Sequence, residues 1–167
     1  EAGLMSHARA FPQAVALMDL SRDAQIWTYA DMARAAERLA AVWQGQGLQP
    51  GDRVAILLPQ CAEALIAHFA AHLIGAVSLP LFVLFGPDAL RFRLKDSGAK
   101  ILVSDQAQYP KICEIQPKLP DLDKVYLRDG ASGLADGLWG AIEAQDAHYR
   151  PIQTRAEDPA MMIYTSG

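Results

Sequence analysis

The chain has 167 residues, of which 51% are hydrophobic and 20% charged, so it is long enough for about one domain with a buried core and is not disordered. A formal net charge of -4, with no cluster of Lys and Arg, argues against nucleic acid as a partner. Cys61 and Cys113 are far apart and lack zinc-finger spacing, which predicts buried or neutral thiols in a reducing, cytoplasmic compartment without structural zinc.

The first part of the chain predicts a pair of strands and then a long helix. Strands are expected at residues 15–20 and 26–28, with a turn at 21–24 between them. Thr28 is expected to cap the helix, because its hydroxyl can accept a hydrogen bond from the backbone of Asp31. Apolar residues at helical spacing predict one buried face, made of Met32, Ala35, Ala36, Leu39, Val42 and Trp43.

From residue 53 onward, strand and helix patterns alternate. Short apolar runs predict buried strands at residues 53–58, 77–79, 101–103, 125–127 and 161–164. Helices are expected between them at residues 62–74, 87–96 and 138–144. This alternation predicts an α/β fold with a doubly wound, mostly parallel sheet and helices on both faces.

The sequence predicts neither a membrane span nor a signal peptide. The longest apolar stretch, residues 62–85, is interrupted by Glu63, His68, His72, Gly75 and Pro80, so it does not make a clean transmembrane helix. Residues 1–13 have no basic segment followed by an apolar one.

The most informative motif is Tyr164-Thr165-Ser166-Gly167, which follows an apolar strand. A glycine lets the backbone approach an anion, while hydroxyls and exposed amides donate to its oxygens, so this turn could form part of a phosphate site. A strand that ends in a small polar turn is also an ordinary structural feature. Both interpretations stay open on these four residues alone.

Other polar residues favour structural roles. His68 and His72 lie four apart on one predicted helix, but no third ligand is evident, which favours core histidines over a metal site. Ser104 and Asp105 follow a strand, where they could contact a ligand or cap a turn. The apolar run at residues 83–85 could line a pocket or pack in the core.

The motifs of several other enzyme classes are missing. The chain contains no Walker motif and no Gly-x-Gly-x-x-Gly after its first strand, which argues against P-loop and dinucleotide-binding mechanisms. It also lacks a Gly-x-Ser-x-Gly elbow and a Cys/His pairing, so a serine or thiol hydrolase has little support.

Five segments in order carry a resemblance to a known family. They are Trp27-Thr28-Tyr29-Ala30-Asp31-Met32; Pro50-Gly51-Asp52-Arg53-Val54-Ala55; Ile74-Gly75-Ala76-Val77 with Pro80 and Leu81; residues 84–90 with Arg93-Leu94 and residues 96–100; and residues 163–167. Together they resemble the adenylate-forming acyl-CoA synthetases, relatives of the luciferases and of peptide-synthetase adenylation domains. The fourth segment looks most like the short- and medium-chain acyl-CoA synthetases.

The resemblance implies a function in two chemical steps. A small-molecule carboxylic acid would react with Mg²⁺-ATP to give an acyl-adenylate and pyrophosphate, and coenzyme A would then displace AMP. By position, Thr165, Ser166 and Gly167 would form the opening of the phosphate loop and so contact ATP. No residue of this chain is given a catalytic or metal-binding role.

The resemblance also implies a domain assignment. Residues 1–167 are expected to be the N-terminal portion of the AMP-binding domain, cut within the phosphate loop and lacking the C-terminal domain. This piece alone is expected to be inactive, and its open apolar edges could support a homo-oligomer. The alternative is a non-catalytic α/β binding or assembly module, because fold does not fix function.

Overall fold

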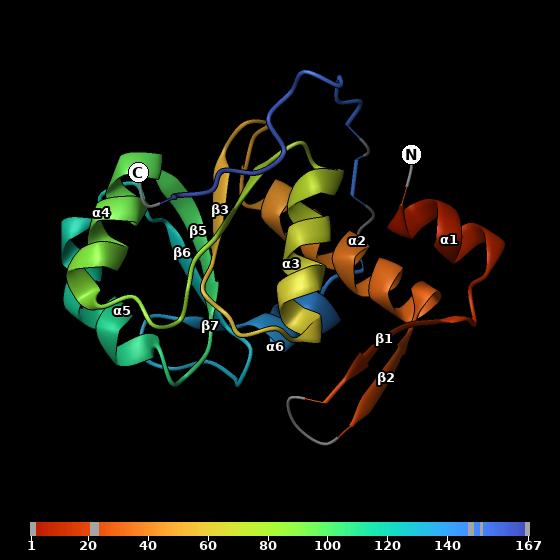
Figure 1. Cartoon of the computed structure of the whole chain (residues 1–167), viewed down its shortest axis with the longest axis horizontal. Helices are drawn as coiled ribbons and strands as arrows, with labels where there is room; N and C mark the ends of the chain where they lie inside the picture. Colours follow the sequence, from red (N-terminus) through yellow and green to blue (C-terminus); the bar gives the residue numbers. More distant parts are fainter. Residues whose placement is uncertain (1–2, 21–23, 147–148, 151, 166–167) are drawn as a thin grey trace.

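The computed structural model describes residues 3–20, 24–146, 149–150 and 152–165. A short helix, α1 (Leu4–Ala10), leads into an antiparallel hairpin of β1 (Val15–Asp19) and β2 (Gln25–Thr28), which projects from the rest of the molecule (Figure 1). Both predicted strands are confirmed, and most of the turn expected between them lies outside the described residues. Helix α1 was not predicted, because only Leu4 of its seven residues is buried and no apolar periodicity develops.

The long helix α2 (Tyr29–Gly45) begins where the sequence predicts it. The Thr28 hydroxyl accepts a hydrogen bond from the Asp31 backbone N–H at 3.1 Å, which confirms the cap. The predicted apolar face is buried, and Ala33, Ala40 and Ala41 are buried as well. The helix is covered this widely because it packs against α1 and against two later helices.

The centre of the molecule is a five-stranded sheet in the order β4-β3-β5-β6-β7. Its strands are β3 (Arg53–Ile56), β4 (Val77–Pro80), β5 (Ala99–Ser104), β6 (Lys124–Leu127) and β7 (Asp136–Gly137). All neighbouring pairs are parallel, so the carboxyl ends of the strands lie together, where open α/β sheets bind ligands. The sequence did not predict β7, because a strand of two residues is too short to show an apolar run or an alternation of apolar and polar residues.

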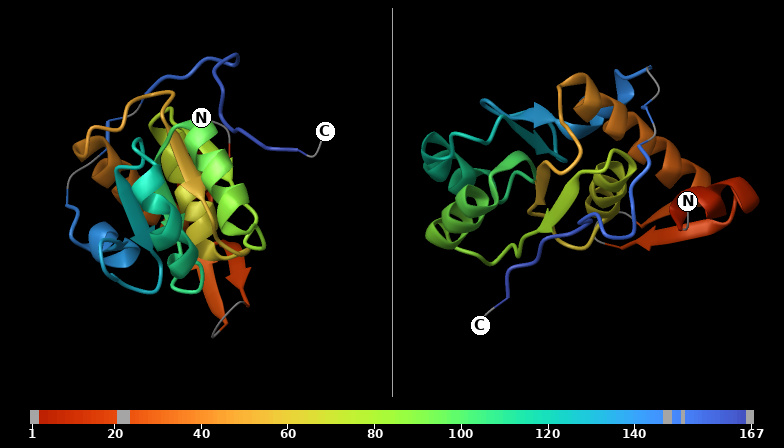
Figure 2. Two further views of the ribbon diagram at one scale, coloured as in Figure 1. Left: turned by 90° about the vertical axis from the view of Figure 1, so that its left-hand side faces the viewer. Right: turned by 90° about the horizontal axis from the view of Figure 1, so that it is seen from above.

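Helices cover both faces of this sheet (Figures 1 and 2). On one face, α2, α3 (Ala62–Leu73) and α6 (Leu138–Glu143) share a buried cluster with Val54 and Ile56 of β3. On the other, α4 (Pro87–Ser97) and α5 (Tyr109–Ile115) share one with Ala55, also of β3. Successive side chains of a strand point to opposite faces, so β3 supplies both clusters. The doubly wound α/β prediction is confirmed.

Helix α4 has the ends that its sequence predicts. Pro87 occupies the first turn, where its missing N–H costs no hydrogen bond. Gly98 follows the last residue with a φ of 59°, a left-handed conformation that suits glycine, and its N–H donates to the Leu94 and Lys95 carbonyls. Helix α5 and the 3-10 turn η1 (Gln116–Lys118) were not predicted. Within the described ranges, no helix is long and apolar enough to cross a membrane.

Candidate functional site

The residues predicted to contact phosphate follow a segment that lies beside β4 (Figure 1). The Ser78 N–H donates to the Ala160 carbonyl at 3.0 Å, and the Met162 N–H donates to the Ser78 carbonyl at 2.9 Å. Ser78 and Met161 thus form a parallel bridge. The predicted strand at residues 161–164 is wrong in extent, since Met161 is the one residue of it that bridges β4 before the segment turns away.

Of the predicted phosphate-contacting residues, the structure describes one. Thr165 is exposed at the end of the described chain, and Ser166 and Gly167 lie outside the described residues. The phosphate role of the three residues therefore stays a prediction. What the structure does define is the residue before them, Tyr164, and its surroundings.

Tyr164 attaches this segment to α4. Its hydroxyl donates to Asp96 Oδ2 at 2.6 Å and lies 3.4 Å from the Arg93 carbonyl oxygen, and its ring meets Phe92 edge-on with centroids 6.3 Å apart. The pKa of the Tyr164 hydroxyl is raised to about 12. Burial is the largest cause, and the hydrogen bond to Asp96 and the negative charge of that carboxylate add to it. The hydroxyl is therefore protonated near neutral pH, which lets it donate to the carboxylate.

Arg93 lies close to two aromatic rings. The centre of its guanidinium is 4.1 Å from the Phe85 ring centroid and 5.5 Å from that of Tyr164. Its Nη1 donates to the Ala89 carbonyl within α4 at 3.0 Å, while its buried Nε has no hydrogen-bond partner. One cation thus contacts both the loop after β4 and the segment before Thr165.

The loop after β4 contains the apolar run at residues 83–85. The sequence leaves two interpretations of this run open, a pocket lining or a part of the core. Val83 and Phe85 pack partly against the cluster of α4 and α5, whereas Leu84 is 77% exposed. Lys111 of α5 also holds the loop, because its Nζ donates to the Val83 and Phe85 carbonyls at 3.0 and 3.2 Å. The core interpretation therefore holds for two of the three residues.

His72 helps to hold the segment against β4. Its Nε2 lies 3.0 Å from the Ala160 carbonyl oxygen and 3.2 Å from the hydroxyl of the buried Ser78. Burial, and then the neighbouring His72, lower the pKa of His68. Among the described residues, no group of three or more His, Cys, Asp and Glu could hold a metal ion.

A buried ion cluster, centred on Arg128, lies at the carboxyl end of the sheet. The Arg128 side chain is 9% exposed and lies 3.7 Å from Glu63, 3.9 Å from Asp105 and 3.8 Å from Asp129. The sequence interpretation missed this cluster. A signal was present, because Arg128 directly follows an apolar strand, where α/β proteins place polar contacts.

The Ser104–Asp105 pair has structural roles, as the turn-capping interpretation expects. The Ser104 hydroxyl donates to the Leu57 carbonyl at 3.1 Å, which joins β5 to the residue after β3. Asp105 Oδ1 accepts a hydrogen bond from the Gln108 backbone N–H at 3.1 Å and so closes the turn before α5.

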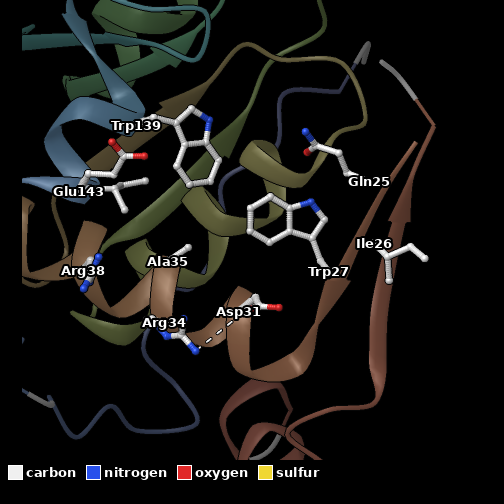
Figure 3. A pocket seen from close by; sticks show the side chains of 10 residues that line it. Gln25, Ile26, Trp27, Asp31, Arg34, Ala35, Arg38, Trp139 and Glu143 are labelled. Atoms are coloured by element: carbon white, nitrogen blue, oxygen red, sulfur yellow. Dashed lines mark ion pairs between the residues drawn. The ribbon is translucent and has the colours of Figure 1, made fainter. Parts of the chain in front are cut away.

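A groove of about 470 Å³ lies between β2, α2 and α6 (Figure 3). In it Trp27 and Trp139 stack with ring centroids 5.6 Å apart, while Arg34 lies 3.8 Å from Asp31 across one turn of α2.

A second cavity, of about 760 Å³, adjoins Pro59 and Cys61 after β3. Both cysteines are free; Cys61 is buried, whereas Cys113 is exposed, and burial raises the pKa of the Cys61 thiol.

Comparison with known proteins shows what this chain is similar to. The family model described as AMP-binding enzyme matches residues 4–167. An acetyl-coenzyme A synthetase of Emericella nidulans is 33% identical over 180 residues, covering 96% of this chain and 27% of the relative. The long-chain-fatty-acid–CoA ligase FadD13 of Mycobacterium tuberculosis is 30% identical over 164 residues, covering 98% of this chain and 32% of the relative. The chain therefore spans about a quarter to a third of these relatives.

Solved structures agree with this comparison. The N-terminal domain of FACL13 from Mycobacterium tuberculosis superposes with a TM-score of 0.87 at 26% identity, over 98% of this chain and 40% of that one. The apo structure of MbtA from Mycobacterium smegmatis superposes with a TM-score of 0.88 at 28% identity, over 98% of this chain and 30% of that one.

Proposed function

The chain belongs to the family of AMP-binding enzymes, and from this premise we propose that it is part of an ATP-dependent acyl-CoA synthetase. In the first step a carboxylate attacks the α-phosphorus of ATP, and pyrophosphate leaves. In the second, the thiol of coenzyme A attacks the acyl carbon, AMP leaves and a thioester forms. The protein would thus be an AMP-forming acid–thiol ligase. The observation that carries this proposal is the family match over residues 4–167.

The substrate would be a small-molecule carboxylic acid. This class covers both acyl groups in the names of the two relatives, an acetyl group in one name and a long-chain fatty acid in the other. Because one methylene changes binding by only about 1–3 kcal/mol, acids of several lengths belong in the test.

Thr165, Ser166 and Gly167 would contact the phosphates of ATP. Two hydroxyls and a glycine after an extended segment suit such a role, because they offer donors and close backbone approach. Mg²⁺ enters as the phosphate-bound partner of ATP, where it offsets negative charge. The described residues offer no carboxylate or histidine cluster to hold the ion independently.

Residues 1–167 would be the N-terminal portion of the AMP-binding domain. They span 27% of the acetyl-coenzyme A synthetase relative, so the proposed reaction requires more chain than these residues supply. We expect the isolated 167-residue polypeptide not to form an acyl-adenylate.

The test is carboxylate-dependent exchange of radiolabelled pyrophosphate into ATP by the full-length native protein. Acetate, octanoate and palmitate are assayed in parallel, followed by CoA-dependent release of AMP. Exchange with at least one acid and CoA-dependent AMP release are expected. Absence of exchange with all three would favour the non-catalytic binding or assembly module, and exchange by the 167-residue polypeptide would contradict the assignment of a partial domain.

Two further properties belong to the proposal. A cytoplasmic location is supported by the two free cysteines, one of which is exposed. Self-association of residues 1–167 is supported by two exposed apolar residues, Met161, which bridges the edge strand β4 and is 45% exposed, and Ile163, which is 62% exposed. Light scattering is expected to give a mass above that of a monomer, and a monomeric mass across the concentration range would rule this out.

A further inference from the structure

The hairpin of β1 and β2 has a bonded base and an exposed outer face. At the base, the Tyr29 N–H donates to the Ala14 carbonyl at 3.0 Å, next to the start of α2. Met18 and Ile26 are cross-strand partners on the outer face, and they are 60% and 63% exposed. A two-stranded sheet is marginal in water by itself, so the contacts of the opposite, inner face must hold it in place.

Both strands of the hairpin are linked to the first turn of α3. Asp19, at the end of β1, accepts a hydrogen bond from the Ala62 N–H at 2.8 Å. Trp27 of β2 stacks on Trp139, whose indole N–H donates to Glu63 at 3.2 Å. Because Ala62 and Glu63 are consecutive, the two attachments meet at one place on the helix.

Asp19 supplies the cap that α3 does not provide for itself. Cys61 occupies the N-cap position, and its side chain makes no capping hydrogen bond. The first N–H groups of a helix lack partners within the helix, and a carboxylate is favoured beside them. The hydrogen bond from Ala62 to Asp19 meets this need across 43 positions of sequence.

Glu63 is shared between the hairpin attachment and the buried ion cluster. Its Oε1 accepts the hydrogen bond from Trp139, and its Oε2 lies 3.7 Å from Arg128 Nη1. The Glu63 side chain is 12% exposed, and a carboxylate buried to this extent needs a partner of opposite charge. Arg128 therefore helps to keep Glu63 where Trp139 can donate to it.

The hairpin also forms one wall of the cavity of about 760 Å³ that follows β3. Leu17 and Leu20 line the cavity from the hairpin, and Leu65 and His68 line it from α3. The Cys61 side chain lines it too and is 5% exposed. A movement of the hairpin away from α3 would open this cavity and uncover Cys61.

We propose that the hairpin is a hinged wall of this cavity, held closed by its contacts with the first turn of α3. In the open state the backbone hydrogen bonds at the base remain, while the attachments through Asp19 and Trp139 are lost. Such a local opening requires less free energy than global unfolding. The hairpin thereby controls the entry of small molecules into the cavity, a role that goes beyond the adenylation chemistry and does not depend on it.

The experiment measures opening with two probes in the full-length native protein. One is alkylation of Cys61 by iodoacetamide, followed by mass spectrometry of the peptide that contains it. The other is hydrogen exchange of the hairpin, residues 15–19 and 25–28, compared with the sheet, residues 53–56 and 99–104. The variants are Asp19→Ala, Trp139→Phe and Arg128→Met, and the matched control is Arg91→Met, which removes an exposed ion pair on α4.

Each of the three variants is expected to speed Cys61 alkylation and hairpin exchange by about 10- to 100-fold, because each removes an interaction with a charged partner. Exchange of the sheet should change far less. A change in the thiol itself does not explain faster alkylation in Arg128→Met. Burial is the main cause of the raised Cys61 pKa, and the positive charge of Arg128 lowers that pKa, so its loss would leave less reactive thiolate.

Three results would overturn this inference. Equal acceleration of exchange in the hairpin and the sheet would indicate global unfolding, and rates within about twofold of Arg91→Met would show that these contacts do not hold the hairpin. Faster hairpin exchange with unchanged Cys61 alkylation would show that the hairpin does not close the cavity. If Arg128→Met does not fold, Asp19→Ala and Trp139→Phe decide by the same probes. Neither probe requires turnover, so the result is separate from failure of the proposed function.

Discussion

Trp27 of β2 and Trp139 of α6 stack with ring centroids 5.6 Å apart and ring planes inclined by 18°. Trp139 also donates from its Nε1 to Glu63 Oε1 at 3.2 Å, which extends the contact to α3. The N-terminal hairpin is thus attached to helices from much later in the chain (Figure 3). This attachment explains why a projecting two-stranded hairpin, marginal by itself, has a fixed place on the molecule.

Replacing Trp139 with alanine should destabilise the protein by about 2–4 kcal/mol, the sum expected for an aromatic pair and a hydrogen bond to a charged group. Trp139→Phe keeps one aromatic ring to stack on Trp27 but loses the N–H donor and part of the indole's area, so it should cost less than alanine. Urea denaturation of both variants measures the difference. Equal losses would mean that the stacked ring contributes nothing.

Arg128→Met should lower the free energy of unfolding by about 3 kcal/mol or more, because it leaves buried carboxylates without their cation. The partners, Glu63 and Asp105, have side chains only 12% and 8% exposed. Arg91→Met, at an exposed pair, should cost about 1 kcal/mol at most. Thermal unfolding of the two variants is the measurement, and similar midpoints would refute the importance of the buried cluster.

Two glycine-to-alanine substitutions should change the stability of the protein in opposite directions. At Gly98 the left-handed backbone, and a Cβ that would lie 2.8 Å from Arg53 Nη2, should make alanine about 1–2 kcal/mol less stable. At Gly140, inside α6, a Cβ would meet nothing within 4 Å, so alanine should add up to about 1 kcal/mol. Chemical denaturation tests both, and a stabilising Gly98→Ala would contradict the observed helix end.

The Tyr164 hydroxyl should titrate at about pH 12 in absorbance measurements, above its ordinary value of 10, and Asp96→Asn should lower its pKa. Because folding raises this pKa, folding favours the protonated form. The resulting stabilisation is complete below pH 10 and is lost as the pH rises through about 12. An unchanged pKa in Asp96→Asn would show that the carboxylate has no influence on it.

The fold could be predicted wherever the chain carries a local signal. The Thr28 cap, the Pro87 start and the Gly98 end of α4 depend on single residues, and the apolar runs of β3 to β6 identified four of the five strands of the sheet. Elements without such a signal were missed. Helix α5 buries only Ile112 and Ile115, and β7 is two residues long.

The surroundings of the candidate site were less predictable, because they depend on contacts between distant residues. Tyr164 is 68 positions from Asp96 and 71 from Arg93, and neither helical nor strand periodicity encodes such a pairing. The Arg128 cluster likewise joins the end of β6 to the start of α3. The motif at residues 164–167 indicated where the site begins but not what holds it.

The open side of β4 has a consequence for synthesis on the ribosome. Ser78 is hydrogen-bonded to Ala160, which lies 82 positions later in the chain. Because translation adds about 5–20 residues per second, the edge of β4 stays uncovered for roughly 4–16 seconds after Ser78 is synthesised. N–H groups alternate along a strand; that of Ser78 points outward and that of Leu81 points to β3. By that alternation Pro80 occupies the next outward position, where it has no N–H to offer. The nascent edge is thereby a poor template for a strand from another molecule during the interval in which such pairing would lead to aggregation.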